Sequence, residues 1–170
     1  GGRWGRLVRL RIHDSENGIV DDSDDGLIAL CLVWRCGSAI SPGRTELVAQ
    51  NVLDSNENGI TVGTFGNEGN RLLNNIVQRT TGGQPISLGT SQVVAEHNLV
   101  DTVIIGPLGG PWPQGTNLYN ALAQFVNAAG LDFHLLAGSP ARGLGVDLSE
   151  VPTDFDGQPW GSPRNAGAYR

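Results

Sequence analysis

A short apolar pattern returns along the first two thirds of this chain at a near-constant spacing, and this periodicity constrains the fold more than any other feature. Three sets of apolar anchors share it. The first set is Ile12, Leu32, Val52, Ile76 and Leu99, separated by 20, 20, 24 and 23 residues. The second set follows the first four of these after a polar turn, at Ile19, Ile40, Ile60 and Ile86. The third set precedes the first, at Val8, Ile28, Val48, Leu72 and Val94.

Three short strands in every repeat predict a three-sided solenoid. One coil cannot bury its apolar sides alone, whereas stacking coils about 4.8 Å apart pairs each strand with its copies above and below. The sequence therefore predicts an all-β, right-handed parallel β-helix of about five coils. Two alternatives stay open. One is a β-sandwich with accidental spacing, and the other is a leucine-rich repeat, which has a similar period but would favour Leu at the anchors and needs room for a helix.

Asparagine recurs directly before three anchors of the first set, at Asn51, Asn75 and Asn98. In stacked coils these residues would lie above one another and bond through their side-chain amides. Asn also tolerates the left-handed backbone of a tight turn, and we expect that conformation at these positions. In the first two coils Arg11 and Cys31 take the equivalent place, so the predicted ladder is incomplete.

The composition agrees with many short strands joined by tight turns. The chain has 25 glycines and only 6% aromatic residues. Gly18 and Gly59 directly precede Ile19 and Ile60, where they indicate sharp entries into strands. Cys31 and Cys36 lie within one expected coil; buried free thiols and a local disulfide both remain open, whereas no neighbouring His or further Cys favours a metal site.

Several segments resemble the pectate-lyase-like right-handed β-helix superfamily. They are QNVLDSNENGI at 50–60, DFHLLAGSPARGLG at 132–145, DFDGQPW at 154–160 and GAYR at 167–170, the last three similar to the closing segment of secreted bacterial β-helix repeat proteins. The resemblance implies an extracellular or cell-surface location and a polysaccharide as the partner. It does not imply one activity, because the superfamily includes lyases, hydrolases, epimerases and non-catalytic adhesins.

The repeat stops after Ile105, and a different organisation is expected beyond it. We expect residues 1–106 to form the coils, N-terminally truncated, and residues 107–170 to form a C-terminal helix and capping tail of the same domain. The helix is predicted over Asn117–Ala129 from apolar residues at helical spacing, with Gly130 ending it. The tail would cover strand edges of the last coil or one flank. The uncapped first coil allows a homo-oligomer.

Charge and residue types exclude several function classes. The net charge is −6, all eleven basic residues are Arg, and no basic stripe exists to bind nucleic acid. No apolar stretch reaches the length needed to span a membrane. Without lysine, the chain has no Schiff-base former and no lysine of a phosphate-binding loop.

No complete catalytic set is visible. In the resembled enzymes the substrate lies along one stacked sheet, and the outward residues of its counterpart here are Val20, Ser41, Thr61 and Ser87, none of them an acid, His or Arg. Lyases need a base and a cation for the uronate, and hydrolases need two carboxylates. His13, Asp14 and Asp54 are weak candidates elsewhere. His97 and His134 are better explained by packing.

A binding face is expected on the neighbouring strand and turn. There Asp14, Trp34, Asp54 and Gln78 align across successive coils, with Ser15, Arg35, Ser55 and Arg79 beside them. Trp34, Arg35, Asp54 and Arg79 are the predicted substrate-binding residues, since an indole stacks on sugar rings while Asp and Arg bond to hydroxyls. These positions are equally compatible with ordinary coil surface.

An acidic run follows the first strand of the second anchor set. Asp21, Asp22, Asp24 and Asp25 could bind Ca²⁺, although a solvated acidic turn is the simpler interpretation. The hypothesis for the whole chain is an extracellular β-helix protein that binds polysaccharide and, in a full-length parent, takes part in processing it by lyase-like or hydrolase-like chemistry. The alternative is a non-catalytic structural or self-associating solenoid module.

Overall fold

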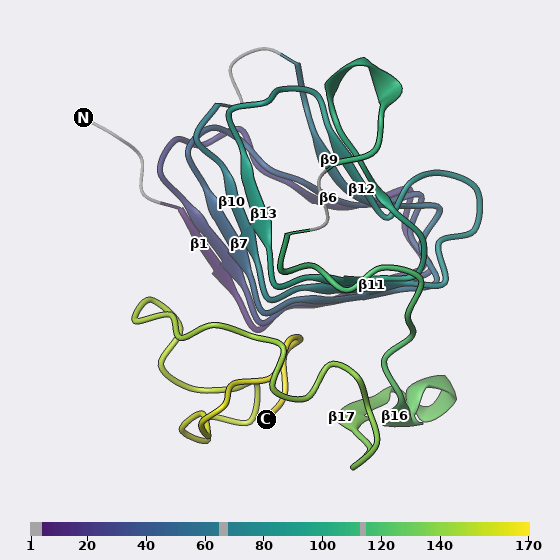
Figure 1. Cartoon of the computed structure of the whole chain (residues 1–170), viewed down its shortest axis with the longest axis vertical. Coiled ribbons are helices and arrows are strands. Elements are labelled where there is room, and N and C mark those ends of the chain that lie inside the picture. The colour runs from purple at the N-terminus through teal and green to yellow at the C-terminus, as the bar shows by residue number, and fades with distance from the viewer. Residues whose placement is uncertain (1–4, 65–67, 113–114) are drawn as a thin grey trace.

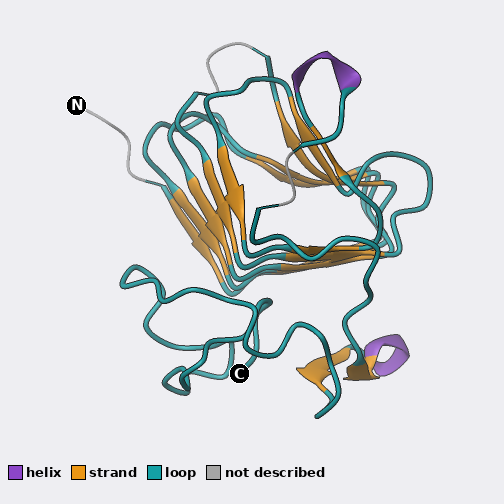
Figure 2. Ribbon diagram, viewed as in Figure 1, coloured by secondary structure: helices purple, strands orange, loops and turns teal. Residues whose placement is uncertain are grey.

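The chain forms a parallel β-solenoid of five coils with a long C-terminal tail along one side (Figure 1). The computed structural model describes residues 5–64, 68–112 and 115–170. Each coil contributes one short strand to each of three parallel sheets, so the sandwich and the leucine-rich repeat are both excluded. Loops and turns connect the strands (Figure 2).

The three sheets have five strands each. The first sheet contains β1 (Arg6–Val8), β4 (Leu27–Ala29), β7 (Leu47–Ala49), β10 (Arg71–Leu73) and β13 (Val94–Glu96). The second contains β2 (Arg11–His13), β5 (Leu32–Trp34), β8 (Val52–Asp54), β11 (Ile76–Gln78) and β14 (Leu99–Val100). The third contains β3 (Asn17–Val20), β6 (Ser38–Ser41), β9 (Asn58–Val62), β12 (Ile86–Leu88) and β15 (Ile104–Ile105).

The predicted register is confirmed for the second anchor set. It is wrong by one residue in the first coil for the first set, and in the first and last coils for the third set. Ile19, Ile40, Ile60 and Ile86 stack in the third sheet and are continued by Ile104. In the second sheet, however, Leu32 pairs with Arg11 rather than Ile12. In the first sheet Ile28 pairs with Leu7 rather than Val8, and Leu72 pairs with Ala95 rather than Val94.

The slips have a physical reason, which is that strands of the first two sheets are apolar on both faces. In β5, Val33 belongs to the cluster that fills the solenoid, together with Leu53 and Val77 of neighbouring coils. Its neighbour Leu32 belongs to a second cluster, formed between the coils and the tail. Hydrophobicity alone therefore cannot tell which residue of such a strand faces inward.

The asparagine ladder is confirmed and is longer than expected. The Asn75 Oδ1 atom accepts hydrogen bonds from the backbone nitrogen and the amide of Asn51, at 3.1 and 3.0 Å. Asn98 binds Asn75 in the same way, and Asn117 binds Asn98. Each Asn amide also donates to a backbone carbonyl of another turn or strand, at 2.7 to 3.0 Å. In the first coil this place belongs to Leu10, not Arg11, because of the register slip.

The left-handed backbone does not lie at Asn51, Asn75 and Asn98 but at the residue before each of them, and before the equivalent Leu10 and Cys31. These corner residues, between the first and second sheets, are Arg9, Leu30, Gln50, Asn74 and His97, with φ between 57° and 59°. The prediction was therefore displaced by one position. The glycine prediction also needs correction: Gly18 and Gly59 have no positive φ, and a Cβ at Gly59 would lie only 2.4 Å from the Val77 side chain and closer still to the Pro85 carbonyl.

The predicted helix over Asn117–Ala129 is wrong. Asn117 is the last residue of the ladder, and Leu118 forms a parallel bridge with Leu99. The described residues up to Gln124 are turns, bends and extended chain, followed by β16 (Phe125–Asn127) and the short 3-10 helix η2 (Ala128–Gly130). The apolar spacing reflects an incomplete further coil, since Asn117-Leu118 follows Asn98-Leu99 after 19 residues.

The tail lies against the outer faces of the first and second sheets, as Figure 1 shows below their shared corner. It contains β17 (Asp132–Leu135), which pairs with β16 in an antiparallel ribbon. Phe133, Leu148, Val151 and Tyr169 share one buried cluster with residues of both sheets. A short 3-10 turn, η1 (Pro107–Gly109), precedes the tail.

The corner residues attach this tail to the coils. Gln50 donates to the Asn165 carbonyl at 3.1 Å, Asn74 donates to the Val146 carbonyl at 2.8 Å, and Arg9 donates to the Phe155 carbonyl at 3.2 Å. The His97 ring bonds to the Leu144 carbonyl at 2.8 Å, which supports the packing role expected for it. A left-handed residue in each coil thus directs one side chain toward the tail.

Two remaining sequence expectations concern the cysteines and membrane spans. Cys31 and Cys36 are both free and buried, so the disulfide alternative is excluded. Burial raises the pKa of the Cys31 thiol to about 11. Among the described residues, no helix is long and apolar enough to cross a membrane.

We expect Asn75→Ala to destabilise the protein by about 3 kcal/mol, because it leaves buried hydrogen-bonding groups of the adjacent coils without partners. Asn75 is fully buried and bonds to Asn51, Asn98 and the Val48 carbonyl. Urea denaturation measures the change. Asn17→Ala in β3 is the matched control, since Asn17 is exposed and should change stability by less than about 0.5 kcal/mol. Equal losses for the two variants would contradict the ladder's role.

Candidate functional site

Three successive coils and the tail enclose a pocket of about 320 Å³ on the outer side of the second sheet. We call it the sheet pocket. Its lining residues are Trp34, Arg35, Asp54, Ser55, Arg79, Ala128, Ala129, Leu131 and Phe133. All four predicted substrate-binding residues, Trp34, Arg35, Asp54 and Arg79, therefore meet in one place. The tail side of the pocket, from Ala128 to Phe133, was missed by the sequence reasoning, because no pattern indicates where an irregular segment docks.

An ion pair fixes the arginine at one edge of the sheet pocket. Arg35 forms a bidentate contact with Asp14, with nitrogen–oxygen distances of 2.6 and 2.7 Å. The other partner of Asp14 is the His13 ring, at 2.6 Å. The hydrogen bonds from Arg35 and then His13 hold the pKa of Asp14 well below its usual range. Asp14 is therefore a permanent anion that orients a guanidinium.

A buried carboxylate occupies the middle of the pocket wall. Asp54 is 4% exposed and accepts hydrogen bonds from Arg79, Ser55 and the Gln78 amide. Gln78 is also bound to the tail, because its Oε1 atom accepts from the Ala123 nitrogen at 2.7 Å. The carboxylate thus holds Arg79 and Gln78 in place, and Gln78 connects the pocket to the tail.

Trp34 forms the wall of the pocket rather than an open platform. Its side chain is buried, the His13 ring stacks on it at 4.6 Å, and Phe133 lies 6.1 Å away. The expected column has to be corrected here as well. His13, not Asp14, pairs with Trp34, while Asp54 and Gln78 follow as predicted.

The outward residues of the third sheet form an uncharged strip, as the sequence predicts. Val20, Ser41, Thr61 and Ser87 stand in successive strands in register, and Val20 is 59% exposed. The strip itself carries no carboxylate, His or Arg. A groove of about 450 Å³ runs beside it, past the acidic run and Arg44.

The four aspartates of the acidic run do not converge. Asp21 accepts from the Ser23 nitrogen at 2.8 Å, Asp24 lies 3.8 Å from Arg44, and Asp22 and Asp25 are exposed. In the described part of the chain, no group of three or more His, Cys, Asp or Glu is arranged to hold a metal ion. Calcium binding at this run stays a prediction.

A carboxyl that the sequence reasoning missed lies beneath the acidic run. Glu46 is fully buried, and its Oε1 atom accepts from the Ser23 hydroxyl at 3.1 Å. Gly26 of the preceding coil leaves the space for it, since a Cβ there would come within 2.9 Å of that oxygen. Burial, followed by the charge of Asp21, raises the pKa of Glu46 to about 8. The sequence did contain a signal for this buried carboxyl. The positions equivalent to Glu46 in the neighbouring coils are Gly26 and Asn70, so a Glu stands where the repeat places interior residues.

His134 binds two carboxylates in the tail. Its ring nitrogens lie 2.6 Å from Asp132 and 2.9 Å from Asp156, and the ring packs on Tyr169. Partial burial opposes the charged form, but the bonds to Asp132 and Asp156 outweigh it and raise the pKa of His134. The contact joins β17 to the loop near residue 156, which agrees with the packing role expected for this residue.

Comparison of the chain with protein-family models, with curated proteins and with solved structures gives no match in any of the three.

Glu46 should make the protein less stable as pH rises. Its pKa is about 8 in the folded chain against 4.5 for the free side chain, so the folded state binds the extra proton between these values. The contribution of Glu46 to the free energy of unfolding is therefore fully present below pH 4.5. It is lost as pH rises toward 8, by at most about 1.4 kcal/mol per pH unit. Glu46→Gln, which stays neutral, should remove this part of the decline.

Urea denaturation at pH 5, 6, 7 and 8 measures the effect as the difference between wild type and variant. Comparison with the variant is needed because the pKa of His134 is also raised in the folded state, so His134 loses its own contribution to stability as pH rises. That loss is the same in both proteins and cancels in the difference. Asp22→Asn serves as the control, since Asp22 is exposed. Parallel pH profiles for wild type and Glu46→Gln would show that the folded Glu46 is ionised like a surface carboxylate.

Proposed function

We propose that this chain is an extracellular polysaccharide-binding solenoid, and that the sheet pocket holds the sugar. The observation that carries the proposal is the convergence of Trp34, Arg35, Asp54 and Arg79 from three coils on one pocket. Such pockets bind ligands through apolar walls and a few well-placed polar groups.

The chemistry of the pocket suits a sugar ring. Arg35 and Arg79 are each anchored by a carboxylate, so their remaining N–H groups are fixed donors for hydroxyl oxygens. Leu131 and Phe133 supply apolar surface on the opposite side. Because the donors are already oriented, binding costs little side-chain entropy.

Binding without turnover is the activity that these residues support. A general acid must carry a proton at the working pH, and Asp14 has a lowered pKa and is held by Arg35. Asp54 is engaged with Arg79 and Gln78, and His13 lies stacked on Trp34. Any lyase-like or hydrolase-like processing in a longer parent protein therefore falls, in this proposal, to residues outside this chain.

The proposal includes membership of the pectate-lyase-like superfamily and a right-handed course of the coils. It is supported by three parallel sheets, by the ladder of Asn51, Asn75 and Asn98, and by the strong preference of parallel β crossovers for the right hand. A bacterial, secreted origin belongs to the same proposal.

One observation favours a second candidate, a self-associating structural module. In the described part of the chain, β1, β2 and β3 pair with another strand on one side only. Unpaired strand edges are templates for further strands. Light scattering at several protein concentrations separates the two candidates, because only self-association predicts a mass that rises with concentration.

Arg35→Gln and Ala129→Trp should each weaken polysaccharide binding about tenfold, the first by removing a charged donor and the second by filling the pocket. Both residues are exposed, so the fold should tolerate the changes. Affinity gel electrophoresis in pectate, alginate, chondroitin sulfate and a neutral glucan measures binding as retarded migration.

Arg6→Gln, an exposed arginine of β1 outside the pocket, is the control for the loss of charge. The proposal fails if no polysaccharide retards the wild-type protein, or if both pocket variants migrate as the wild type does.

A further inference from the structure

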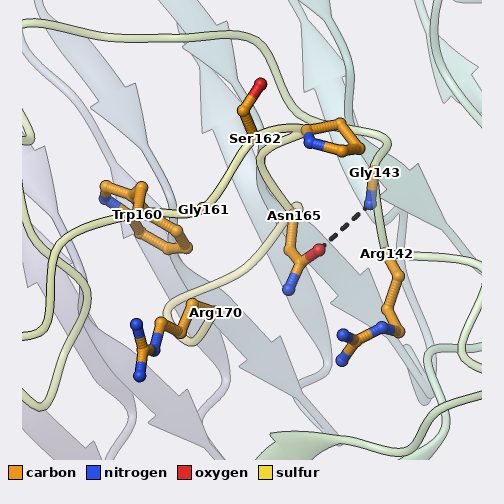
Figure 3. Close-up of a pocket in the computed structure, with 8 residues that line it drawn as sticks. Arg142, Gly143, Trp160, Gly161, Ser162, Asn165 and Arg170 are labelled. Atoms are coloured by element: carbon orange, nitrogen blue, oxygen red, sulfur yellow. Dashed lines mark hydrogen bonds between the residues drawn. The ribbon is translucent and has the colours of Figure 1, made fainter.

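The tail contains a pocket of its own, of about 510 Å³, formed where the chain turns back near its C-terminus. We call it the tail pocket. Figure 3 shows the side chains around it, which include Arg142, Trp160, Ser162, Asn165 and Arg170. The sequence reasoning singled out none of them as a binding residue.

The tail pocket is lined by hydrogen-bond donors without an opposing carboxylate. The Arg142 guanidinium has no hydrogen bond or ion pair to any described residue. The Arg170 guanidinium donates one long hydrogen bond, of 3.5 Å, to the Pro159 carbonyl. No acidic residue is among the described residues that line the pocket. The pocket therefore brings together two arginines that have no carboxylate partner among the described residues. The sheet pocket differs, because Arg35 and Arg79 are both neutralised there.

A buried asparagine adds a third donor. Asn165 is 7% exposed, and its Oδ1 atom accepts from the Gly143 nitrogen at 3.0 Å. This bond leaves the amide nitrogen free to donate. In Figure 3 that nitrogen is turned away from Gly143, toward the side of the pocket where the Arg142 and Arg170 guanidinium groups lie.

Trp160, the aromatic wall of the tail pocket, is held in place by Arg164. The Arg164 guanidinium lies 4.9 Å from the centre of the Trp160 ring, and Arg164 is itself buried and donates to the Val151 carbonyl. The Asn165 carbonyl is bound by Gln50 of the coils. The indole is therefore held by Arg164 of the tail, the Asn165 side chain by Gly143, and the Asn165 backbone by the coils, so the site is preorganised.

We propose that the tail pocket binds an acidic sugar through its carboxylate. Arg142 and Arg170 take the carboxylate, because a guanidinium matches its two oxygens. The Asn165 amide donates a further hydrogen bond, and the sugar ring lies against Trp160. The size of the pocket favours a ring-bearing ligand over a small inorganic anion. This site is separate in residues and chemistry from the sheet pocket, so either proposal can fail without the other.

The test follows the indole N–H signals of the ¹⁵N-labelled full chain by NMR while a ligand is added, with Trp160→Phe identifying the Trp160 signal. Glucuronate is the probe, glucose is its neutral counterpart, and inorganic phosphate is the small anion. We expect a saturable shift of the Trp160 signal with glucuronate and none with glucose.

Arg142→Gln should weaken the glucuronate affinity about tenfold, and Arg142→Lys should weaken it less, because the charge remains while the paired donors are lost. Arg6→Gln is again the control and should leave the affinity unchanged. Arg142 is exposed, and an unshifted Trp160 signal in the ligand-free variant shows that the pocket is intact.

The proposal is overturned if glucuronate gives no saturable shift, or if Arg142→Gln binds it as the wild type does. Equal affinities for phosphate and glucuronate would overturn the sugar assignment, since the pocket would then recognise negative charge alone.

Discussion

Hydrogen bonds between the stacked amides of Asn51, Asn75, Asn98 and Asn117 are the interaction on which the solenoid depends. Where the chain turns between the first and second sheets, backbone groups are buried and need hydrogen-bond partners. Each Asn side chain accepts a hydrogen bond from a backbone nitrogen of the preceding coil and donates one to a backbone carbonyl of that coil. The side chain thus supplies the hydrogen bonds that water would make if these groups were exposed. Where Leu10 and Cys31 replace Asn, the ladder ends, and the first coil is also the one whose strands are most exposed.

The same corner explains why the tail lies where it does. In each of the five coils the residue before the ladder position has a left-handed backbone, and its side chain meets the tail, as for Gln50 and Asn74. The tail then buries the outer faces of two sheets, while the third sheet keeps an open, uncharged face. Strands such as Leu32–Trp34 are buried on both sides as a result.

The sheet pocket forms only where the tail docks on the coils, whereas the tail pocket is lined by tail residues alone. The sheet pocket is closed by Leu131 and Phe133 of the tail, and the tail pocket is held to the coils by the bond between Gln50 and Asn165. Their electrostatics differ, since carboxylates neutralise the arginines of the first, whereas Arg142 of the second has no carboxylate partner among the described residues. A polysaccharide binder with one site for hydroxyl groups and another for a carboxylate is consistent with both.

The sequence by itself determined the number of coils, the three parallel sheets and the asparagine ladder, because a side chain repeated at a constant period must stack on its own copies. It also brought the four residues of the sheet pocket into two neighbouring columns, since Trp34 and Asp54 align in one and Arg35 and Arg79 in the next. It did not determine the register of the end coils, because Leu7 and Val8 are equally apolar and face different clusters. Only the tertiary structure decided the fate of residues 117–170: Asn117 and Leu118 continue the stack although their spacing fits a helix, and the tail has no period. Its position, and with it the donors of Arg142, Asn165 and Arg170, follows from contacts between residues up to 146 positions apart, which local patterns do not encode.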